Sequence, residues 1–297
     1  MRVAVVGPGR VGTALALALP RAAYEVVAVA GRGRAALAAF TARLPEAEIR
    51  ALPQVAVDVD LVLVCVPDDA IGSVVREVAK ADGVRAHSRW VHTSGGYGTE
   101  VLRPAALCGA QVAACHPVMT FPDPDRGLER LPGVSWAVTA DSDRDLAWAH
   151  TFVTDLGGSP VTVPAHARTL YHAGMAMGSN ATVAVVTLAR DLLLGAGIAD
   201  PEAFLGPLAT ASARNAAEHG AAALTGPVRR GDAKTVARHL TQLRAVMPEA
   251  VDTYVAVSAL ALRYARRAGL DDEAAEAVAA ALAAPLAAPV EGDGEGA

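Results

Sequence analysis

Short apolar runs recur along the first half of the chain, separated by segments whose apolar positions suit a helix. Uninterrupted apolar runs of this kind are typical of parallel strands that are covered on both faces. They predict strands at 3–6, 25–30, 60–68, 89–95, 111–117, 134–140 and 159–164. Helices are predicted between them, first after residue 12 and then over 34–44. Strands alternating with helices indicate an α/β fold with a doubly wound Rossmann-type sheet.

The pattern changes beyond Pro164, where the strand signals stop and alanine-rich helical segments follow. Glycine and proline interrupt these segments, and Asp200 and Asp232 stand where acidic residues cap helices. The chain ends in a glycine-rich, acidic stretch with little to bury, which predicts disorder. We therefore expect a Rossmann-like domain, an all-helical carboxyl-terminal domain and a disordered tail, at 1–163, 164–285 and 286–297.

One helical stretch, 169–189, carries no formally charged side chain and is about as long as a bilayer-spanning helix. It contains His172, Ser179, Asn180 and several glycines, and it lacks the aromatic belts of a membrane span. We expect a helix that is buried all round by other protein, and no membrane association.

Composition narrows the classes of function. The net charge is −5 and the basic residues are scattered, which argues against a nucleic-acid surface or a polybasic membrane anchor. An odd number of cysteines at unpatterned spacing favours reduced thiols, and no charged-then-apolar leader precedes the first strand, so a cytoplasmic protein is expected. Histidine and cysteine occur at no metal-ligand spacing, so we expect no metal.

The first predicted strand runs directly into the segment GPGRVG, residues 7–12. A strand, a G-x-G-x-x-G turn and a helix start form the arrangement that binds the pyrophosphate of a dinucleotide. Gly7 would make the tight turn, Gly9 would admit the pyrophosphate, and Gly12 would let the helix pack on the strand. Arg10 and Val11 complete the loop at the helix N-terminus, which favours negative charge. A glycine turn that binds nothing is the alternative, which the flanking strand and helix disfavour.

Twenty residues beyond the glycines, NAD-binding proteins place an acid that binds the ribose hydroxyl. This chain has Arg32 there, with Arg34 close by. Arginine pairs with a 2′-phosphate through charge-assisted hydrogen bonds, so the position predicts NADP. A solvated loop is the alternative.

In doubly wound sheets, ligands bind at the carboxyl ends of the strands. The strand-end turns therefore add three candidate cofactor contacts, Val66, Pro67 and Ser94, the last within HTSGG. His116 also stands at the end of a predicted strand.

A nicotinamide enzyme that reduces a carbonyl needs a proton donor and a group that orients the substrate. The chain has two lysines, and neither is on the long helix, so histidine is the more natural donor, either His172 or His116. Arg168 is four residues before His172 and could hold a substrate carboxylate, as could Arg230, while Asn180 could bind the reacting oxygen. For each of these residues, the alternative is a polar side chain that makes its hydrogen bonds within the fold and has no part in catalysis or binding.

The motifs GPGRVG, CVPDDAI, HTSG, HPVMTFP, YHAGMAMGSN and LTGPVRRGD follow one another in this order. The series resembles the family that joins a Rossmann-like domain to domain of unknown function 2520. That family is similar to the 6-phosphogluconate dehydrogenase, pyrroline-carboxylate reductase and ketopantoate reductase group, and some members are regarded as ketopantoate reductases of pantothenate synthesis. The resemblance implies a phosphate loop at Gly7, Gly9 and Gly12, a polar cleft with His116, His172 and Asn180, and a homodimer through the helical domain. The lysine of the commoner ketopantoate reductases is missing.

The leading hypothesis is an NADPH-dependent oxidoreductase that reduces a small anionic 2-oxo acid, with ketopantoate the best guess. Two alternatives stay open. One is an imine reductase or a deazaflavin-linked NADP reductase, and the other is a protein that binds NADP as a signal without turnover.

Overall fold

The computed structural model describes residues 1–284, so the tail predicted at 286–297 lies outside the described residues. The chain forms two compact units, the first from Met1 to Gly178 and the second from Ser179 onward. The division falls later than the expected boundary at 163/164, because the helix that begins at Arg168 is tied to the sheet of the first unit by hydrogen bonds.

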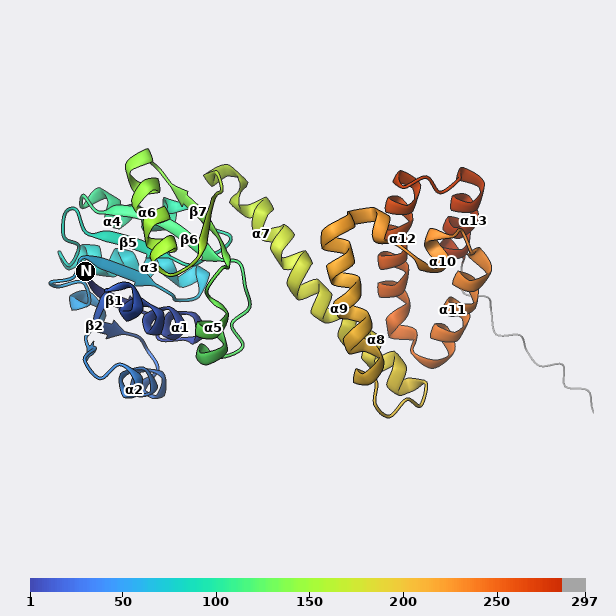
Figure 1. The fold of residues 1–297 in the computed structure, drawn as a ribbon, viewed down its shortest axis with the longest axis horizontal. Coiled ribbons are helices and arrows are strands. Elements are labelled where there is room, and N and C mark those ends of the chain that lie inside the picture. Colours follow the sequence, from blue (N-terminus) through green and yellow to red (C-terminus); the bar gives the residue numbers. More distant parts are fainter. Residues whose placement is uncertain (285–297) are drawn as a thin grey trace, which may run out of the picture. The chain divides into compact units, whose positions relative to one another are not determined.

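The first unit is built on one sheet, of which the strands β1, β2, β5, β6 and β7 are labelled in Figure 1. Its strands are β1 (Arg2–Val6), β2 (Glu25–Ala30), β3 (Glu48–Ile49), β4 (Leu61–Val64), β5 (Arg89–His92), β6 (Gln111–Pro117), β7 (Ser135–Ala140) and β8 (Ser159–Thr162). The spatial order is β3-β2-β1-β4-β5-β6-β7-β8. All neighbours pair in parallel except β6 and β7, which are antiparallel. The chain therefore reverses the strand order after β3, as in a doubly wound sheet.

Helices connect these strands. They are α1 (Arg10–Ala18), α2 (Arg34–Arg43), α3 (Asp68–Lys80), α4 (Arg103–Leu107), α5 (Pro124–Arg130), α6 (Asp143–Asp155) and α7 (Arg168–Ala176). Short 3₁₀ turns lie at Leu19–Ala22, Leu52–Gln54, Thr99–Leu102, Ala165–Ala167, Gly220–Ala223 and Pro248–Ala250.

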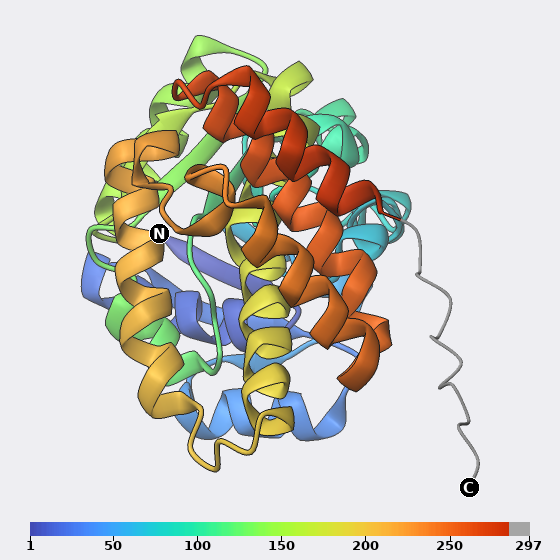
Figure 2. The ribbon, with the colours of Figure 1, turned by 90° about the vertical axis from the view of Figure 1, so that its right-hand side faces the viewer.

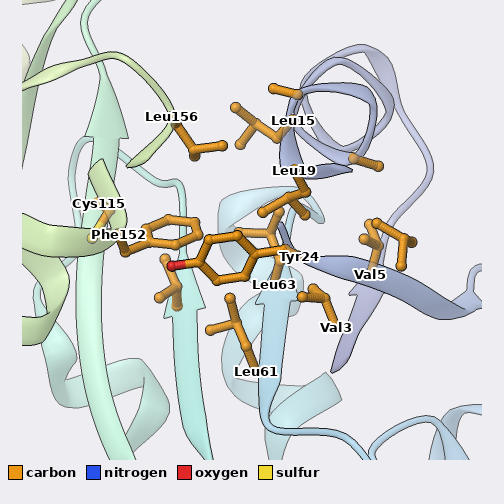
Figure 3. Close-up of a cluster of buried hydrophobic side chains, with 14 of the residues drawn as sticks. Val3, Val5, Leu15, Leu19, Tyr24, Leu61, Leu63, Cys115, Phe152 and Leu156 are labelled. Carbon is orange, nitrogen blue, oxygen red and sulfur yellow. The ribbon is translucent and has the colours of Figure 1, made fainter. Parts of the chain in front are cut away.

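Two apolar cores cover the two faces of the sheet. Successive side chains of a strand point to opposite faces, so Val3 and Val5 enter one core and Ala4 and Val6 enter the other. The first core also takes in the faces of α1 and α6 and is drawn in Figure 3. Strands buried on both faces are uniformly apolar, which is why the sequence pattern located them.

The second unit is helical, and its helices run from yellow through orange to red in Figure 2. A π-helical turn, Met177–Ala181, leads into α8 (Thr182–Gly195), followed by α9 (Glu202–His219), α10 (Gly226–Arg229), α11 (Ala233–Val246), α12 (Val251–Arg267) and α13 (Asp272–Ala283). The core of this unit comes from α10 to α13, with Val236 and Val278 fully buried. Asp232 caps α11 as expected, because its carboxylate accepts a hydrogen bond from the Thr235 N–H at 3.0 Å.

The predicted fold class is confirmed, and a strand forms in each of the seven predicted runs. The missed strand is β3, which has two exposed residues and so no apolar signature. The uncharged stretch 169–189 was expected to be buried on all sides by other protein. For a single chain this is wrong, because α8 has no buried residue within the described structure.

Candidate functional site

The glycine loop joins β1 to α1, and its close contacts explain why glycine is needed. Gly7 has φ of +97°, and a Cβ atom there would lie 2.6 Å from the Cys65 carbonyl oxygen. A Cβ on Gly12 would lie 2.2 Å from the Gly7 carbonyl oxygen, so α1 rests directly on the loop. Gly9, in contrast, faces open space within the described chain. The loop is therefore tight against the sheet and open on the outside.

The start of α1 suits an anion. Among the described residues, no side chain caps this helix and no acid stands in its first turn. The first N–H groups of a helix point outward and carry partial positive charge, so an uncapped N-terminus beside a glycine loop favours a phosphate.

A cavity of about 640 Å³ opens beside this loop. It is lined by the predicted contacts Gly7, Gly9, Arg32, Val66 and Pro67 together with other residues of the strand ends. The remaining loop residues Arg10, Val11 and Gly12, and also Arg34, are not among its lining residues. Five of the cofactor contacts predicted from the sequence therefore line one cavity, whereas Arg34 does not.

Arg50 also lines this cavity and was missed in the sequence. Its Nε donates to Glu48 at 2.8 Å and its guanidinium donates to the Val57 carbonyl oxygen at 2.7 Å, so the side chain is held in place. Arg32 is exposed at the same cavity. Arg50 directly follows β3, so a search for strand ends would have found it only if that two-residue strand had been recognised.

A second cluster lies at the ends of β5 and β6 and on α7. The His116 Nδ1 atom lies 2.8 Å from the Tyr171 hydroxyl, and the two rings meet edge-on. The ring centroids of His116 and His172 are 6.1 Å apart. The two predicted histidines therefore do come together, and Tyr171 joins them. Tyr171 is adjacent to His172 in the sequence, but a tyrosine on a helix gives no signal by itself.

The HTSGG turn packs against this cluster. A Cβ on Gly95 would lie 2.7 Å from His172 Cδ2 and 3.1 Å from His116 Nε2, so a larger residue would push the rings away. Ser94 is buried, and its hydroxyl donates to Asp68 at 2.6 Å and accepts from two backbone N–H groups of the turn. The Ser94 hydroxyl was expected to meet the cofactor, and instead its hydrogen bonds hold the shape of the turn.

Arg168 was expected to hold a substrate carboxylate, and in the structure its guanidinium is instead bound within the fold. Its side chain is 1% exposed. The guanidinium donates to the carbonyl oxygens of Ser94 and Ala137, at 2.5 and 3.3 Å, and to the Thr139 hydroxyl. Its Nε atom has no hydrogen-bond partner among the described residues. Arg168 lies on the same helix as His172 and four residues before it, as the spacing predicted. Its N–H groups, however, are bound to acceptors of β7 and of the HTSGG turn.

The other two predicted residues belong to the second unit. Asn180 is exposed within the π-helical turn, a feature that is frequent at functional sites. Arg230 is exposed and lines, with Arg229 and Asp271, a cavity of about 750 Å³ in that unit.

Burial controls the charge state of the histidines. It lowers the pKa of His116 to about 4, with contributions from the nearby Arg168 and His172. It also lowers the pKa of His92 to about 4. His92 accepts the Ser94 N–H at Nδ1 and donates from Nε2 to the Gly98 carbonyl oxygen at 2.7 Å, which suits only the neutral ring. Both imidazoles are therefore neutral at pH 7.

This charge state predicts acid sensitivity. The unfolded chain takes up a proton on His92 near pH 6.5, whereas the folded chain resists it until about pH 4. The free energy of unfolding should therefore fall by about 3 kcal/mol from pH 7 to pH 4 through His92 alone. Urea denaturation across this range measures it, and His92→Gln should remove this contribution while that of His116 remains. A native protein of constant stability from pH 7 to pH 5 would contradict the prediction.

Within residues 1–284, no three His, Cys, Asp or Glu side chains gather in a way that could hold a metal ion. In the same range, no helix has the length and apolar character that crossing a membrane requires.

Comparison with known proteins matches two family models. Residues 1–117 match a Rossmann-like domain, and residues 134–261 match a domain of unknown function, DUF2520. No protein with a curated function matches the chain.

Several solved structures share the fold. A Bacteroides fragilis protein to which NADP oxidoreductase activity is ascribed is 24% identical, with a TM-score of 0.73 over 88% of this chain and 97% of the other. A Thermotoga maritima protein is 20% identical, with a TM-score of 0.68 over 90% and 99%. A reductive aminase from Aspergillus terreus, in complex with NADPH and ethyl levulinate, is 16% identical, with a TM-score of 0.61 over 94% and 98%. At these identities the likeness shows a common fold.

Proposed function

The chain belongs to the proteins that join a Rossmann-like domain to domain of unknown function 2520, and from this premise we propose that it is an NADPH-dependent reductase. The single observation that carries the proposal is the cavity in which the glycine loop, Arg32 and Arg50 meet. The substrate would be a small molecule with a C=O or C=N bond.

The residues present fit the cofactor. The open face of Gly9 and the uncapped start of α1 would hold the pyrophosphate. Arg32 and the fixed guanidinium of Arg50 would hold a 2′-phosphate, which an acid at the position of Arg32 would repel. When bound, NADPH supplies the hydride.

For the substrate, a 2-oxo acid such as ketopantoate remains a candidate, with Asn180 orienting the reacting oxygen. Of the two arginines proposed for the carboxylate, Arg168 donates its hydrogen bonds within the fold, and Arg230 is the remaining candidate. An imine is a second candidate, favoured by the fold shared with a reductive aminase. A deazaflavin-linked reductase and a sensor that binds NADP without turnover are the remaining alternatives.

The test is NADPH oxidation, followed by absorbance. The panel contains ketopantoate, other 2-oxo acids, ethyl levulinate with methylamine, the cyclic imine 1-pyrroline and an oxidised deazaflavin. NADPH and NADH titrations run alongside. Turnover of one compound with a preference for NADPH supports the reductase. Tight binding of NADPH without turnover favours the sensor, and binding of neither nucleotide overturns the proposal.

Arg32→Ala is expected to weaken NADPH binding by roughly tenfold to a hundredfold, because a phosphate contact through charged hydrogen bonds contributes about 1.5–3 kcal/mol. NADH has no 2′-phosphate, so its affinity should stay within about twofold. Fluorescence titration of both nucleotides measures the effect. Arg76→Ala on the exposed face of α3 is the control. Equal losses for NADPH and NADH would show that Arg32 does not contact the phosphate.

We also propose that the protein is a homodimer through the helical unit. Val183 on α8 and Phe204 and Leu208 on α9 are each more than 60% exposed, and α8 and α9 have no buried residue within the described chain. Large exposed apolar patches usually mark contact with another protein, and a second copy offers the matching apolar surface. Sedimentation should give the mass of a dimer, and Phe204→Glu with Leu208→Glu should give a monomer. A native monomer contradicts the proposal.

A further inference from the structure

We propose that Tyr171 delivers the proton in the reduction, with His116 orienting its hydroxyl group and Arg168 stabilising the phenolate that forms. The inference rests on the proposed reductase function and names a proton donor that the sequence did not indicate. It is carried by the hydrogen bond between Tyr171 and His116 and by the buried guanidinium beneath Tyr171.

The hydrogen bond defines the direction of the phenolic proton. A neutral imidazole has one N–H group, and a partly buried ring places it where an acceptor exists. Within the described chain, the Nδ1 atom of His116 has a hydrogen-bond partner, the Tyr171 oxygen at 2.8 Å, whereas the Nε2 atom has none and lies 3.1 Å from the position of a Cβ added to Gly95. The geometry therefore assigns the N–H to Nδ1, donating to the phenol oxygen. The phenolic proton is then free to point at a substrate.

His116 itself is a poor acid. Because burial lowers its pKa to about 4, only about one ring in a thousand carries a second proton at pH 7. A neutral phenol is fully protonated at that pH, and burial raises the pKa of Tyr171 further. At pH 7, Tyr171 therefore has a proton to donate, whereas the His116 ring has lost its second proton.

Arg168 explains where the negative charge goes after transfer. Its guanidinium carbon lies 6.0 Å from the centroid of the Tyr171 ring. It forms no ion pair with a carboxylate among the described residues, because its donors are bound to carbonyl and hydroxyl oxygens. Glu100 and Asp68 act on this charge from a distance without forming an ion pair with it. A buried positive charge that lacks an ion-pair partner favours an anion close by. The same charge lowers the pKa of Tyr171 and partly opposes the effect of burial.

Several charged or titratable groups surround this hydroxyl. His116 approaches from β6, and Arg168 and His172 belong to the same helix. Asp68, at the start of α3, and His92, at the end of β5, also act on the charge state of His116. Among the described residues, no lysine and no other arginine contributes to the charge state of His116 or Tyr171.

With NADPH bound, the substrate carbon would accept a hydride from it and be reduced, while the nicotinamide would be oxidised. The C=O or C=N bond becomes a single bond, and its oxygen or nitrogen takes the proton as the Tyr171 O–H bond breaks. Solvent then returns a proton to the phenolate, held meanwhile by the His116 N–H and the charge of Arg168.

The chain offers a matched control. In the second unit, the His239 Nδ1 atom lies 2.8 Å from the Tyr254 hydroxyl, and those rings also meet edge-on, with centroids 5.8 Å apart. The centroid distance for His116 and Tyr171 is likewise 5.8 Å. Tyr254→Phe and Tyr171→Phe therefore each remove a hydrogen bond between a tyrosine hydroxyl and a histidine ring. Tyr254→Phe also removes a hydrogen bond with Ser258, so it is expected to be at least as destabilising as Tyr171→Phe.

The test compares the native protein, Tyr171→Phe and Tyr254→Phe with the same compounds: ketopantoate, ethyl levulinate with methylamine, and 1-pyrroline. We expect Tyr171→Phe to lower kcat by about a hundredfold or more, the usual contribution of a general acid, with the Kd for NADPH unchanged. Tyr254→Phe should keep the native kcat. The native kcat should stay level from pH 6 to pH 9, because the phenol remains protonated across this range.

Two results overturn the assignment alone. One is native-like turnover by Tyr171→Phe. The other is a native kcat that falls tenfold per pH unit across pH 6–8, as donation by protonated His116 requires. If the native protein oxidises NADPH with none of the compounds, the proposed function itself fails, and the assignment fails with it.

Discussion

Gly12→Ala should abolish NADPH binding and destabilise the first unit. The added Cβ would lie 2.2 Å from the Gly7 carbonyl oxygen and 3.1 Å from the Cys65 Cβ. The loop cannot retreat easily, because the Gly7 N–H is bonded to the Ala30 carbonyl oxygen at 2.9 Å and Cys65 is bonded to β1. α1 must therefore move outward, and its N-terminus leaves the position at which a phosphate would bind.

We expect the Kd for NADPH to rise more than a hundredfold and the free energy of unfolding to fall by about 2–4 kcal/mol, as for other overpacked sites. Fluorescence titration and urea denaturation measure the two effects. Gly206→Ala in α9 is the control, because no atom of the described chain lies within 4 Å of its added Cβ. A Gly12→Ala protein that binds NADPH as tightly as the native one would refute the interpretation of the loop.

Arg168→Met should destabilise the protein by about 2–5 kcal/mol, because several buried acceptors then lose their donor. The Ser94 and Ala137 carbonyl oxygens and the Thr139 hydroxyl all receive hydrogen bonds from this guanidinium. The Ser94 bond links α7 to the HTSGG turn, so the loss should also loosen the turn beside His116 and His172. Urea denaturation, with turnover measured in parallel, provides the test.

The control is Arg76→Met, which removes an exposed arginine from α3 and should leave stability within about 0.5 kcal/mol. A substrate clamp would behave differently from a structural arginine. Its removal would leave the free energy of unfolding unchanged and raise the KM of an anionic substrate. That outcome would restore the role that the sequence suggested for Arg168.

Much of the first unit could be predicted from the sequence, because the patterns that define its strands and its glycine loop lie within short segments. Strands buried on both faces are apolar throughout, so β1, β4 and β6 could be recognised from short windows. The glycines at 7 and 12 could be assigned roles because a tight turn between strand and helix demands them. By contrast, β3 and the cavity residue Arg50 escaped, since two exposed residues form no pattern.

The sequence by itself determined the class of fold, the position of the phosphate-type loop and the helix that carries His172. Only the tertiary structure decided what those side chains do. His116 and Tyr171 are 55 positions apart and meet because β6 and α7 lie together in the first unit. Arg168 donates hydrogen bonds to carbonyl oxygens of β7 and of the HTSGG turn, which the spacing along its own helix could not predict. Spacing along a helix predicts which residues share a face, but burial and hydrogen bonding depend on segments that are distant in the chain.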